Sequence, residues 1–379
     1  MITTIKYNVM GINSFIGIDG NEANLVQHRL GSNQFAYGLL KTIEKIDTTH
    51  SYQTYLSTPL LNDMPKTRPG WNYRVIPPHK LWTQWRLPLD LYFRFPRPKV
   101  FLSLSHYVPR FSPVPRIVTI TDLGYLKFPE QLLKKDLLQL KLWTAYSLKV
   151  ADHIIAISEF TKQDILDNYQ IDKSKISVIY PGYDRSVFNV SLKKGGAKLV
   201  LRKYNISTPY LLFLGALKPS KNVERLIEAF NQLNENDIKL VIAGKKGWLY
   251  ESIFEIVKKL NLENKVIFTG FVSDKDIPLL MSHAEAFALP SLYEGFGMPV
   301  VESMACGVPV LVSNQGSLPE VVGNAGIVVN PYEVQSIANG IKKTIKEKER
   351  LIQDGLKRVR LFNWDISAKK TITLLDQYL

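Results

Sequence analysis

Short apolar runs alternate with amphipathic stretches throughout the C-terminal half of the chain. Each run is followed by a turn and by a segment with helical or short helical spacing. The runs cover residues 211–217, 238–244, 265–272, 286–290, 308–313 and 325–329. Because mostly unbroken apolar strands indicate a parallel sheet that is covered on both faces, this half is predicted to be an α/β domain.

The N-terminal half shows the same alternation less regularly. Residues 5–12 are predicted to form the first strand, and a loop through Gly17 and Gly20 then leads to a helix over 34–46. Further strands are predicted over 116–121, 151–157 and 176–180, with an amphipathic helix over 131–150 and Ser158 as a helix N-cap. The polar, glycine-rich stretch 191–198 is the predicted linker. We therefore expect domains at 1–190 and 191–362, and a last helix over 363–379 that docks on the first domain.

Composition limits the class of protein. The chain has 379 residues, of which 45% are hydrophobic and 22% charged, so it is long enough for two domains with cores. Its single cysteine, Cys306, excludes an intrachain disulfide and argues against a cysteine-based zinc site. The N-terminus lacks the pattern of a signal peptide, and no window approaches 18 apolar residues. A cytoplasmic protein without a membrane span is the expectation.

The net charge of +14 favours an acidic partner: nucleic acid, an anionic membrane surface or a phosphorylated substrate. Residues 66–110 hold nine Lys or Arg and one acid, Asp90. Aromatic residues are interleaved with them, namely Trp71, Trp82, Trp85, Tyr92, Phe93 and Phe95. This composition matches a surface on anionic lipid or a single-stranded nucleic-acid groove. A core-packed helix with solvated basic residues fits equally well, although five prolines from Pro77 to Pro98 argue against one continuous helix.

The stretch 285–309 carries the clearest candidate chemistry. A strand over 286–290 turns through Glu294-Gly295-Phe296-Gly297 into a helix whose early turns hold Pro299 and Glu302. Free amides and the positive dipole end of such a helix bind anions. Glu294 and Glu302 lie eight residues apart, roughly 12 Å along a helix. A diphosphate with a sugar at each end would fit this layout, and an ordinary strand–turn–helix with two solvated glutamates fits the pattern equally well.

Other candidates follow predicted strands. Asp122 ends one strand, where it is either a ligand-crevice residue or a turn former. Lys221 follows the strand that ends in Gly215 and is placed at a helix start, where an anion would relieve the unfavourable dipole. A surface lysine is the alternative, and we favour the diphosphate role. Gly31 precedes a helix and is either a phosphate-approach glycine or a turn glycine.

Taken together, Glu294 and Glu302 with the runs ESMACGVPV, GALKPSKN and LVIAGKKGW resemble the retaining glycosyltransferases of family 4. Within that family the chain is most similar to mannosyltransferases of bacterial polysaccharide assembly. The resemblance is strong over the C-terminal half and weaker over the N-terminal half, where IGIDGNEAN, DLGYLKFPE and ADHIIAISEFTK carry it. It implies a GT-B fold, in which two Rossmann-like domains with parallel sheets face an interdomain cleft.

The resemblance also implies roles for single residues. Glu294 would meet the transferred sugar, Glu302 the ribose and Lys221 the diphosphate, while Asp122 and His106 would lie toward the acceptor. The remaining donor-binding positions, mostly through backbone groups, would be Gly31, Gly215, Gly244, Phe271, Val272, Gly295, Phe296, Gly297 and Met298.

Three features qualify this resemblance. Many relatives carry an arginine before the lysine and a histidine before the aspartate, where this chain has Ser220 and Thr121. His106 is the candidate to replace that histidine, with a structural role as the alternative. Asp274-Lys275-Asp276 matches the Asp-x-Asp pattern of metal-dependent enzymes, but its place after Ser273 predicts helix capping. No metal and no cofactor is therefore expected.

The sequence thus predicts an enzyme that moves a hexose, plausibly mannose from GDP-mannose, to a saccharide or lipid-linked saccharide during surface polysaccharide or lipopolysaccharide assembly. The expected partners are the nucleotide sugar, the acceptor and an anionic membrane surface on the inner leaflet, with no nucleic acid. The rival hypothesis is a non-catalytic protein that binds nucleic acid or an anionic surface. That hypothesis predicts salt-sensitive oligonucleotide binding and no turnover.

Overall fold

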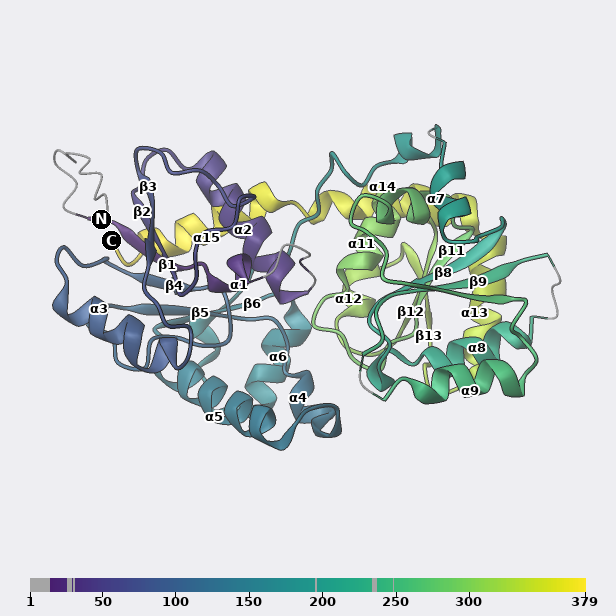
Figure 1. Cartoon of the computed structure of the whole chain (residues 1–379), viewed down its shortest axis with the longest axis horizontal. Helices are drawn as coiled ribbons and strands as arrows, with labels where there is room; N and C mark the ends of the chain where they lie inside the picture. The colour runs from purple at the N-terminus through teal and green to yellow at the C-terminus, as the bar shows by residue number, and fades with distance from the viewer. Residues whose placement is uncertain (1–13, 26–28, 30, 195, 234–236, 248) are drawn as a thin grey trace.

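The computed structural model describes residues 14–25, 29, 31–194, 196–233, 237–247 and 249–379. It contains two parallel sheets side by side, each flanked by helices (Figure 1). The prediction of an α/β chain with two parallel sheets is confirmed. Among the described residues, no helix combines the length and the apolar character needed to span a bilayer.

The N-terminal sheet has seven strands in the order β3-β2-β1-β4-β5-β6-β7. They are β1 (Ile16–Asp19), β2 (Tyr52–Leu56), β3 (Trp71–Val75), β4 (Phe101–Ser103), β5 (Arg116–Ile120), β6 (His153–Ala156) and β7 (Ile176–Val178). The helices are α1 (Asn21–Asn24), α2 (Ser32–Ile46), the π-helical turn η1 (Trp82–Arg86), α3 (Leu87–Phe93), α4 (Gly124–Lys127), α5 (Lys134–Val150) and α6 (Glu159–Asn168). Short 3₁₀ turns cover Pro129–Gln131, Lys173–Lys175 and Val190–Lys194.

The first described strand corrects the sequence prediction. The predicted strand over 5–12 lies outside the described residues, and the segment predicted as a loop forms β1 instead. Ile16 and Ile18 are fully buried in this strand. A Cβ on Gly17 would lie 2.7 Å from the ring of Phe101 on the neighbouring strand. Gly17 therefore allows β1 and β4 to pack closely, whereas the sequence pattern had suggested that it is a loop glycine.

The C-terminal sheet has six strands in the order β10-β9-β8-β11-β12-β13, and all six predicted strands are confirmed. They are β8 (Tyr210–Leu214), β9 (Lys239–Ala243), β10 (Val266–Gly270), β11 (Ala286–Leu289), β12 (Val310–Ser313) and β13 (Gly326–Val329). The helices are α7 (Lys198–Lys203), α8 (Val223–Asn231), α9 (Glu251–Lys259), α10 (Ile277–Ser282), α11 (Met298–Ala305), α12 (Leu318–Val322), α13 (Val334–Lys346) and α14 (Lys348–Arg358). Short 3₁₀ turns cover Pro219–Lys221 and Val359–Leu361.

The last helix, α15 (Trp364–Asp376), lies against the N-terminal half rather than the sheet that precedes it (Figure 1, yellow). It packs on α2, where a Cβ on Gly38 would lie 2.4 Å from the ring of Trp364. Ser367 Oγ donates to the backbone oxygen of Tyr180 at 2.5 Å. The domain boundaries after residues 190 and 362 stay predictions.

Both sheets reverse their strand order once. The chain leaves β1 toward one edge and returns to add β4 on the other side, and β8 and β11 are related in the same way. In open parallel sheets, ligands bind outside the carboxyl ends of strands at such a switch point. The turns after β8 and β11, and after β1 and β4, are therefore the places to examine for a site.

Candidate active site

The turns after β8 and β11 meet through an ion pair. Lys221 Nζ lies 2.5 Å from Glu294 Oε1, and Ser291 Oγ donates to the same oxygen at 2.7 Å. The two charged side chains are 17% and 13% exposed. Sequence reasoning selected Lys221 and Glu294 on separate turns, and the structure brings their side chains into contact in a mostly buried position at the switch point.

The position of Lys221 corrects the prediction of a helix start. Lys221 closes the 3₁₀ turn Pro219–Lys221, and α8 begins only at Val223. Between them, Asn222 adopts φ 58°, and its Nδ2 donates to the backbone oxygens of Pro290 and Pro331 at 3.0 and 2.7 Å. Asn222 thereby fixes the β8 turn against the β11 turn, which brings Lys221 to Glu294.

Gly215 and Gly244 allow neighbouring turns to approach each other. A Cβ on Gly244, whose φ is 151°, would lie 1.9 Å from the backbone oxygen of Gly215. On the next strand, Gly270 has φ 66°, and a Cβ there would meet no atom within 4 Å. Phe271 is 39% exposed and Val272 only 3%, so a ligand could reach Val272 through its backbone alone. Base binding by this loop stays a prediction.

The helix α11 begins as predicted, directly after Gly297 and with Pro299 in its first turn. Gly297 has φ 90°, and no side chain among the described residues caps this helix end. Met298 at the first position is partly exposed. Phe296 is buried, and its ring packs against Tyr180 and Phe362, so only its backbone is available to a ligand.

Glu302 lies in α11 as a half-buried carboxyl. Among the described residues its carboxyl group makes no hydrogen bond and no ion pair. Burial, and to a lesser extent the nearby charge of Asp274, raises the pKa of Glu302 to about 7. A carboxyl group that is desolvated without a partner has spare hydrogen-bonding capacity, as a ribose-binding residue requires.

The N-terminal half contacts this region through the turn after β5. A Cβ on Gly295 would lie 2.1 Å from the backbone oxygen of Thr121 and 2.8 Å from Asp122 Cβ. Asp122 Oδ1 accepts a hydrogen bond from the backbone N–H of Gly124 at 2.8 Å, as a turn former does. Asp122 thus forms the turn, and it lies where the two halves meet. Its role as a ligand-crevice residue stays a prediction.

Ser158 is the predicted N-cap of α6, and this prediction is confirmed. Its Oγ accepts from the backbone N–H of Thr161 at 2.9 Å and donates to the backbone oxygen of Gly295 at 2.8 Å. One hydroxyl therefore caps a helix of the N-terminal half and holds the glutamate loop of the C-terminal half.

Tyr293 and Glu320 also join the halves, and sequence reasoning missed both. Tyr293 Oη donates to Asp164 Oδ2 at 2.6 Å and accepts from the backbone N–H of Leu123 at 2.9 Å. The Glu320 carboxylate accepts from the first two amides of α6, those of Glu159 and Phe160, at 2.8 and 3.0 Å. The only local signal was the place of Tyr293 directly before Glu294.

His106 follows β4 and supports the turn after β5. Its Nε2 accepts from the backbone N–H of Thr121 at 3.2 Å and lies 2.9 Å from Thr121 Oγ1. Burial lowers the pKa of His106, against the opposing charges of Asp122 and Glu22. The proton is thus assigned to Nδ1, which is buried and has no hydrogen-bond partner among the described residues. This geometry favours a positioning role for His106 over acid–base chemistry.

Gly31 precedes α2 with φ 57°, and nothing lies within 4 Å of a Cβ built there. No contact between Gly31 and the Lys221–Glu294 pair is found among the described residues, so its phosphate role stays a prediction. Close by, Glu22 accepts hydrogen bonds from Ser32 Oγ and Asn33 Nδ2, at 2.6 and 3.0 Å. The end of β1 also carries a buried acid that sequence reasoning did not select, Asp19, whose pKa burial raises to about 7.

Lys218 is the cation that sequence reasoning missed. It is half-buried three residues before Lys221, and burial together with the charge of Lys221 lowers its pKa. The charges of Glu294 and Asp122 act on Lys218 in the opposite direction, which places it in the same group of residues. Lys218 is the extended residue directly before the 3₁₀ turn, and the usable signal in the sequence was its place in the same strand-end turn as Lys221. Ser220, where relatives carry arginine, is instead buried beside Gln131, with Oγ to Oε1 at 3.2 Å.

The Asp-x-Asp segment contradicts the capping prediction. Asp276 occupies the N-cap position of α10, but its side chain makes no capping hydrogen bond. Instead its Oδ2 accepts from Lys203 Nζ at 2.6 Å and from Tyr204 Oη at 2.8 Å, which ties α7 to α10. In the part of the chain that the structure describes, no group of three or more His, Cys, Asp or Glu could hold a metal ion. Independence of a metal stays a prediction.

Two cavities, of about 220 and 370 Å³, lie in the N-terminal half, and neither is lined by a candidate residue. Their linings come from the segments around α3 and α5 instead. The chemistry-bearing residues and these two cavities are therefore separate features of the molecule.

Comparison with known proteins identifies two family models in the chain. The model "Glycosyl transferases group 1" matches residues 202–358, and "Glycosyltransferase Family 4" matches residues 60–187. The O-antigen chain mannosyltransferase B of Escherichia coli is 31% identical over 265 residues, which cover 68% of each chain. The O-antigen chain mannosyltransferase RfbU of Salmonella typhimurium is 28% identical over 68% of this chain and 67% of its own.

The fold has solved counterparts. The structure of Anabaena Alr3699/HepE in complex with UDP-glucose matches 96% of this chain and 99% of its own, with a TM-score of 0.72 and 18% sequence identity. At that identity the match concerns the fold. It extends over both sheets, which agrees with the GT-B architecture that the sequence resemblance implied.

Proposed function

Because this chain belongs to the group 1 glycosyl transferases of family 4, we propose that it transfers mannose from GDP-mannose to a saccharide or lipid-linked saccharide, with retention of anomeric configuration. Two relatives named O-antigen chain mannosyltransferases support the sugar and the setting, which is the assembly of a surface polysaccharide or lipopolysaccharide. The complex of a structural neighbour with UDP-glucose supports a nucleotide sugar as the donor. We further propose that the reaction takes place on the cytoplasmic side of a membrane and needs no metal.

The observation that carries this proposal is the Lys221–Glu294 ion pair at the switch point, beside the uncapped start of α11. A diphosphate would compete with Glu294 for the ammonium group of Lys221, and the amides at the start of α11 would bind the same anion. Glu294 would then be free to accept hydrogen bonds from hydroxyls of the transferred sugar. After the exchange Lys221 would pair with the diphosphate and Glu294 would accept hydrogen bonds from hydroxyls, so neither buried charge would be left without a partner.

Departure of the diphosphate is the step that these residues assist. Negative charge develops on the leaving phosphate as the bond to the sugar breaks, and Lys221, with Lys218 near it, would stabilise that charge. Glu302, which has no partner among the described residues, would accept hydrogen bonds from the ribose and orient the donor. The acceptor hydroxyl attacks on the face from which the diphosphate leaves and gives its proton to the departing phosphate oxygen, so the bond to the diphosphate breaks, the new glycosidic bond forms and the anomeric configuration is kept.

Donor identity can be tested by the rise in melting temperature across a panel of nucleotide sugars, since a ligand of the folded state stabilises it according to its occupancy. We expect the largest rise with GDP-mannose. Turnover of that donor with a mannose-containing acceptor should then give an α-linked product, as judged by the one-bond coupling between the anomeric carbon and its proton. A larger rise with a UDP-sugar would overturn the choice of donor, and a β-linked product would overturn retention.

The role of Glu294 can be tested by Glu294→Gln. We expect transfer to fall by at least about 100-fold, as for loss of a preorganised transition-state contact. GDP binding should persist, because Lys221 keeps its charge. Glu285→Gln is the matched control, since Glu285 pairs with Lys348 at 2.7 Å outside the site. Near-normal turnover of Glu294→Gln would contradict the proposal.

A further inference from the structure

The segment 80–99 exposes a series of apolar side chains on the outer surface of the N-terminal half. Trp85, Leu89, Phe93 and Phe95 are 58, 46, 79 and 70% exposed. Positions Trp82, Leu87 and Leu91 of the same segment are buried and hold it to the sheet. The first three exposed residues are spaced by four, and residues with that spacing lie on one face of a helical segment.

The helix α5 continues this surface. Leu138 and Leu142, one helical turn apart, are both 58% exposed, and Lys134, Lys135 and Lys141 beside them are exposed as well. A cavity of about 370 Å³ joins α5 to the first segment. Its lining includes Trp143 of α5, Trp85, and Phe111, which is 53% exposed. The cavity thus connects Trp143 of α5 to Trp85 and Phe111, so α5 and the first segment belong to one surface region.

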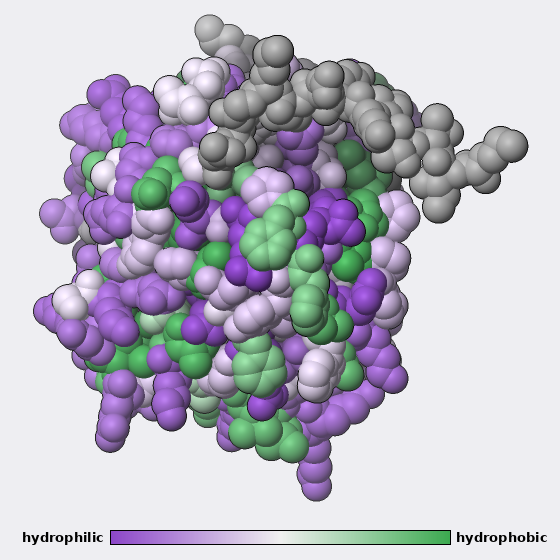
Figure 2. Space-filling view, turned by 90° about the vertical axis from the view of Figure 1, so that its left-hand side faces the viewer, coloured by the Kyte–Doolittle hydropathy of each residue, from purple (hydrophilic) through white to green (hydrophobic). Residues whose placement is uncertain are grey.

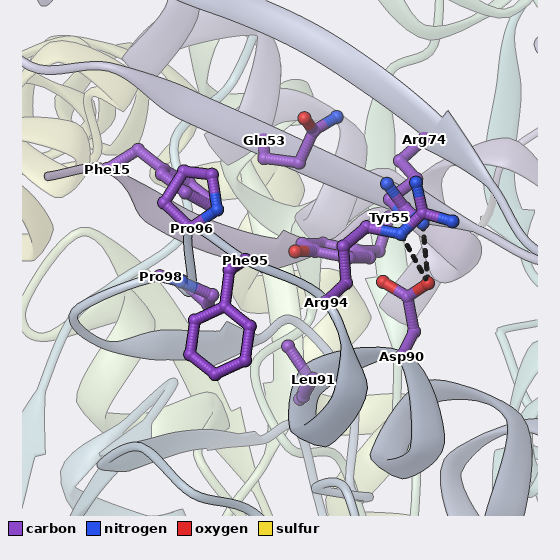
Figure 3. A pocket seen from close by; sticks show the side chains of 10 residues that line it. All are labelled: Phe15, Gln53, Tyr55, Arg74, Asp90, Leu91, Arg94, Phe95, Pro96 and Pro98. Atoms are coloured by element: carbon purple, nitrogen blue, oxygen red, sulfur yellow. Dashed lines mark hydrogen bonds and ion pairs between the residues drawn. The ribbon is translucent and has the colours of Figure 1, made fainter. Parts of the chain in front are cut away.

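The charge of this region is positive. Asp90 is the one acid in residues 66–110, and it lies between Arg74 at 2.6 Å and Arg94 at 3.5 Å (Figure 3). Its side chain is only 12% exposed, so it is both neutralised and screened from a partner. The exposed charged residues of the segment are Lys80, Arg86, Arg94 and Lys99. Figure 2 shows the end of the molecule that carries α3, where apolar groups gather among hydrophilic ones.

We propose that this surface, formed by residues 80–99, Phe111 and α5, docks the protein on an anionic lipid bilayer. Aromatic rings would lie at the headgroup level, and leucine and phenylalanine side chains would reach the acyl boundary while lysine and arginine contact phosphates. Exposed leucines distinguish this surface from a nucleic-acid groove, because an aliphatic side chain offers no ring on which a base can stack. Membrane docking is not part of the proposed function. It rests on that function in one respect: docking would bring the enzyme to a lipid-linked acceptor.

The test is flotation of the full chain with vesicles, in the absence of donor and acceptor. We expect binding to phosphatidylcholine vesicles with about a third phosphatidylglycerol and little binding to phosphatidylcholine alone, since lysine and arginine near an anionic surface each add attraction. High salt should weaken the binding, because screening shortens the Debye length to about 3 Å at 1 M. Equal binding to neutral vesicles would overturn the electrostatic part of the proposal.

Two variant pairs test the surface itself. Phe93→Glu should lower vesicle partitioning at least about 10-fold, since a charge replaces a buried apolar contact. Leu199→Glu in α7, where Leu199 is 80% exposed, makes the same change in charge on the C-terminal half and should have little effect. Lys134→Gln with Lys135→Gln should lower partitioning by about fivefold per lysine. The control pair, Lys258→Gln with Lys259→Gln, lies on α9, where both lysines are exposed.

Equal losses in a test variant and its control would overturn the assignment of the surface. If a single-stranded oligonucleotide binds more tightly than anionic vesicles, and Phe93→Glu weakens that binding, then the partner of this surface is nucleic acid and not a membrane. Vesicle flotation and sugar transfer are measured in separate assays. Lost flotation with intact transfer to a soluble acceptor would refute the membrane surface alone, and intact flotation without turnover would refute the proposed function alone.

Discussion

The strand-end turns of the two sheets use their polar residues in different ways. In the C-terminal half, Lys221 and Glu294 pair with each other, and Glu302 has no partner among the described residues. In the N-terminal half, Asp122 accepts from a backbone amide of its own turn, His106 accepts from the amide of Thr121 in the neighbouring turn, and Ser158 binds the opposite half. Groups that hold backbone are occupied before any ligand arrives. We therefore propose donor binding for the C-terminal turns and positioning for the N-terminal ones.

The largest effect should come from separating the two sets of turns. Gly295→Ala places a methyl group against the backbone oxygen of Thr121, so the halves must move apart. We expect transfer to fall about 100-fold, the loss that a displacement of roughly 1 Å can cause, while calorimetry finds donor binding nearly unchanged. Gly196→Ala is the control, since nothing lies within 4 Å of its Cβ. If Gly295→Ala keeps wild-type turnover, the halves do not need this contact.

The next effect should come from Lys218, which tests whether the donor-binding charges extend beyond the predicted pair. Lys218→Ala removes a half-buried cation beside Lys221, and we expect the donor Kd to rise about 10-fold, equivalent to about 1.4 kcal/mol. Lys218→Arg should recover most of the affinity, and Lys258→Ala on the exposed face of α9 should match wild type. Calorimetric titration with GDP measures all three. An unchanged Kd for Lys218→Ala would leave Lys221 as the cation that matters.

Glu302 should confer a pH dependence that the N-terminal turns lack. Its raised pKa of about 7 means that donor affinity should increase as pH rises from 6 to 8, because the carboxylate accepts the ribose hydrogen bonds. Glu302→Gln should bind several-fold more weakly at pH 8 and show a flat profile. A profile that stays sloped in the variant would place the titrating group elsewhere.

The same group affects stability with the opposite sign. The folded protein holds the proton of Glu302 more tightly than the unfolded chain, in which the pKa is 4.5. Its favourable contribution is complete below pH 4.5 and is lost as pH rises through about 7. Glu302→Gln should therefore unfold with a free energy about 1 kcal/mol higher than wild type at pH 8, a value reduced for partial exposure. Urea denaturation at pH 5 and pH 8 measures the difference.

The smallest effect is expected at His106. His106→Gln keeps a hydrogen-bond acceptor for the amide of Thr121, so kcat should fall only about threefold or less. His106→Phe leaves that amide unpaired and should lower the unfolding free energy by about 1–3 kcal/mol. A loss of more than about 100-fold in kcat for His106→Gln, with a changed pH profile, would instead make His106 an acid–base group.

The strands that could be predicted from the sequence are those whose formation depends on a local apolar pattern. The six C-terminal strands were predictable because each is an uninterrupted apolar run. In the N-terminal half, β3 was missed because most of its residues are only partly buried, and β4 because it has three residues. Polar Gln53 and Thr54 interrupt the pattern of β2.

The candidate site divides in the same way. Lys221 and Glu294 follow strands in a recognisable order, so both could be chosen from sequence. The bond from Tyr293 to Asp164 joins residues 129 positions apart, and no spacing rule reports such a contact. Asp276 satisfied a local capping rule, yet Lys203 and Tyr204, more than 70 positions away, determine its contacts. Local patterns thus identified the chemistry, and tertiary contacts determined its surroundings.

The return of α15 to the N-terminal half affects how the molecule is made and how it moves. Trp364 lies against Phe35 and fills the space beside Gly38, so the part of the core that is translated early cannot close until a late segment leaves the ribosome. The chain also passes between the halves twice, once between β7 and β8 and once between α14 and α15. Any rotation of one half against the other must bend both connections, which restricts the motion to an axis that passes near the two of them.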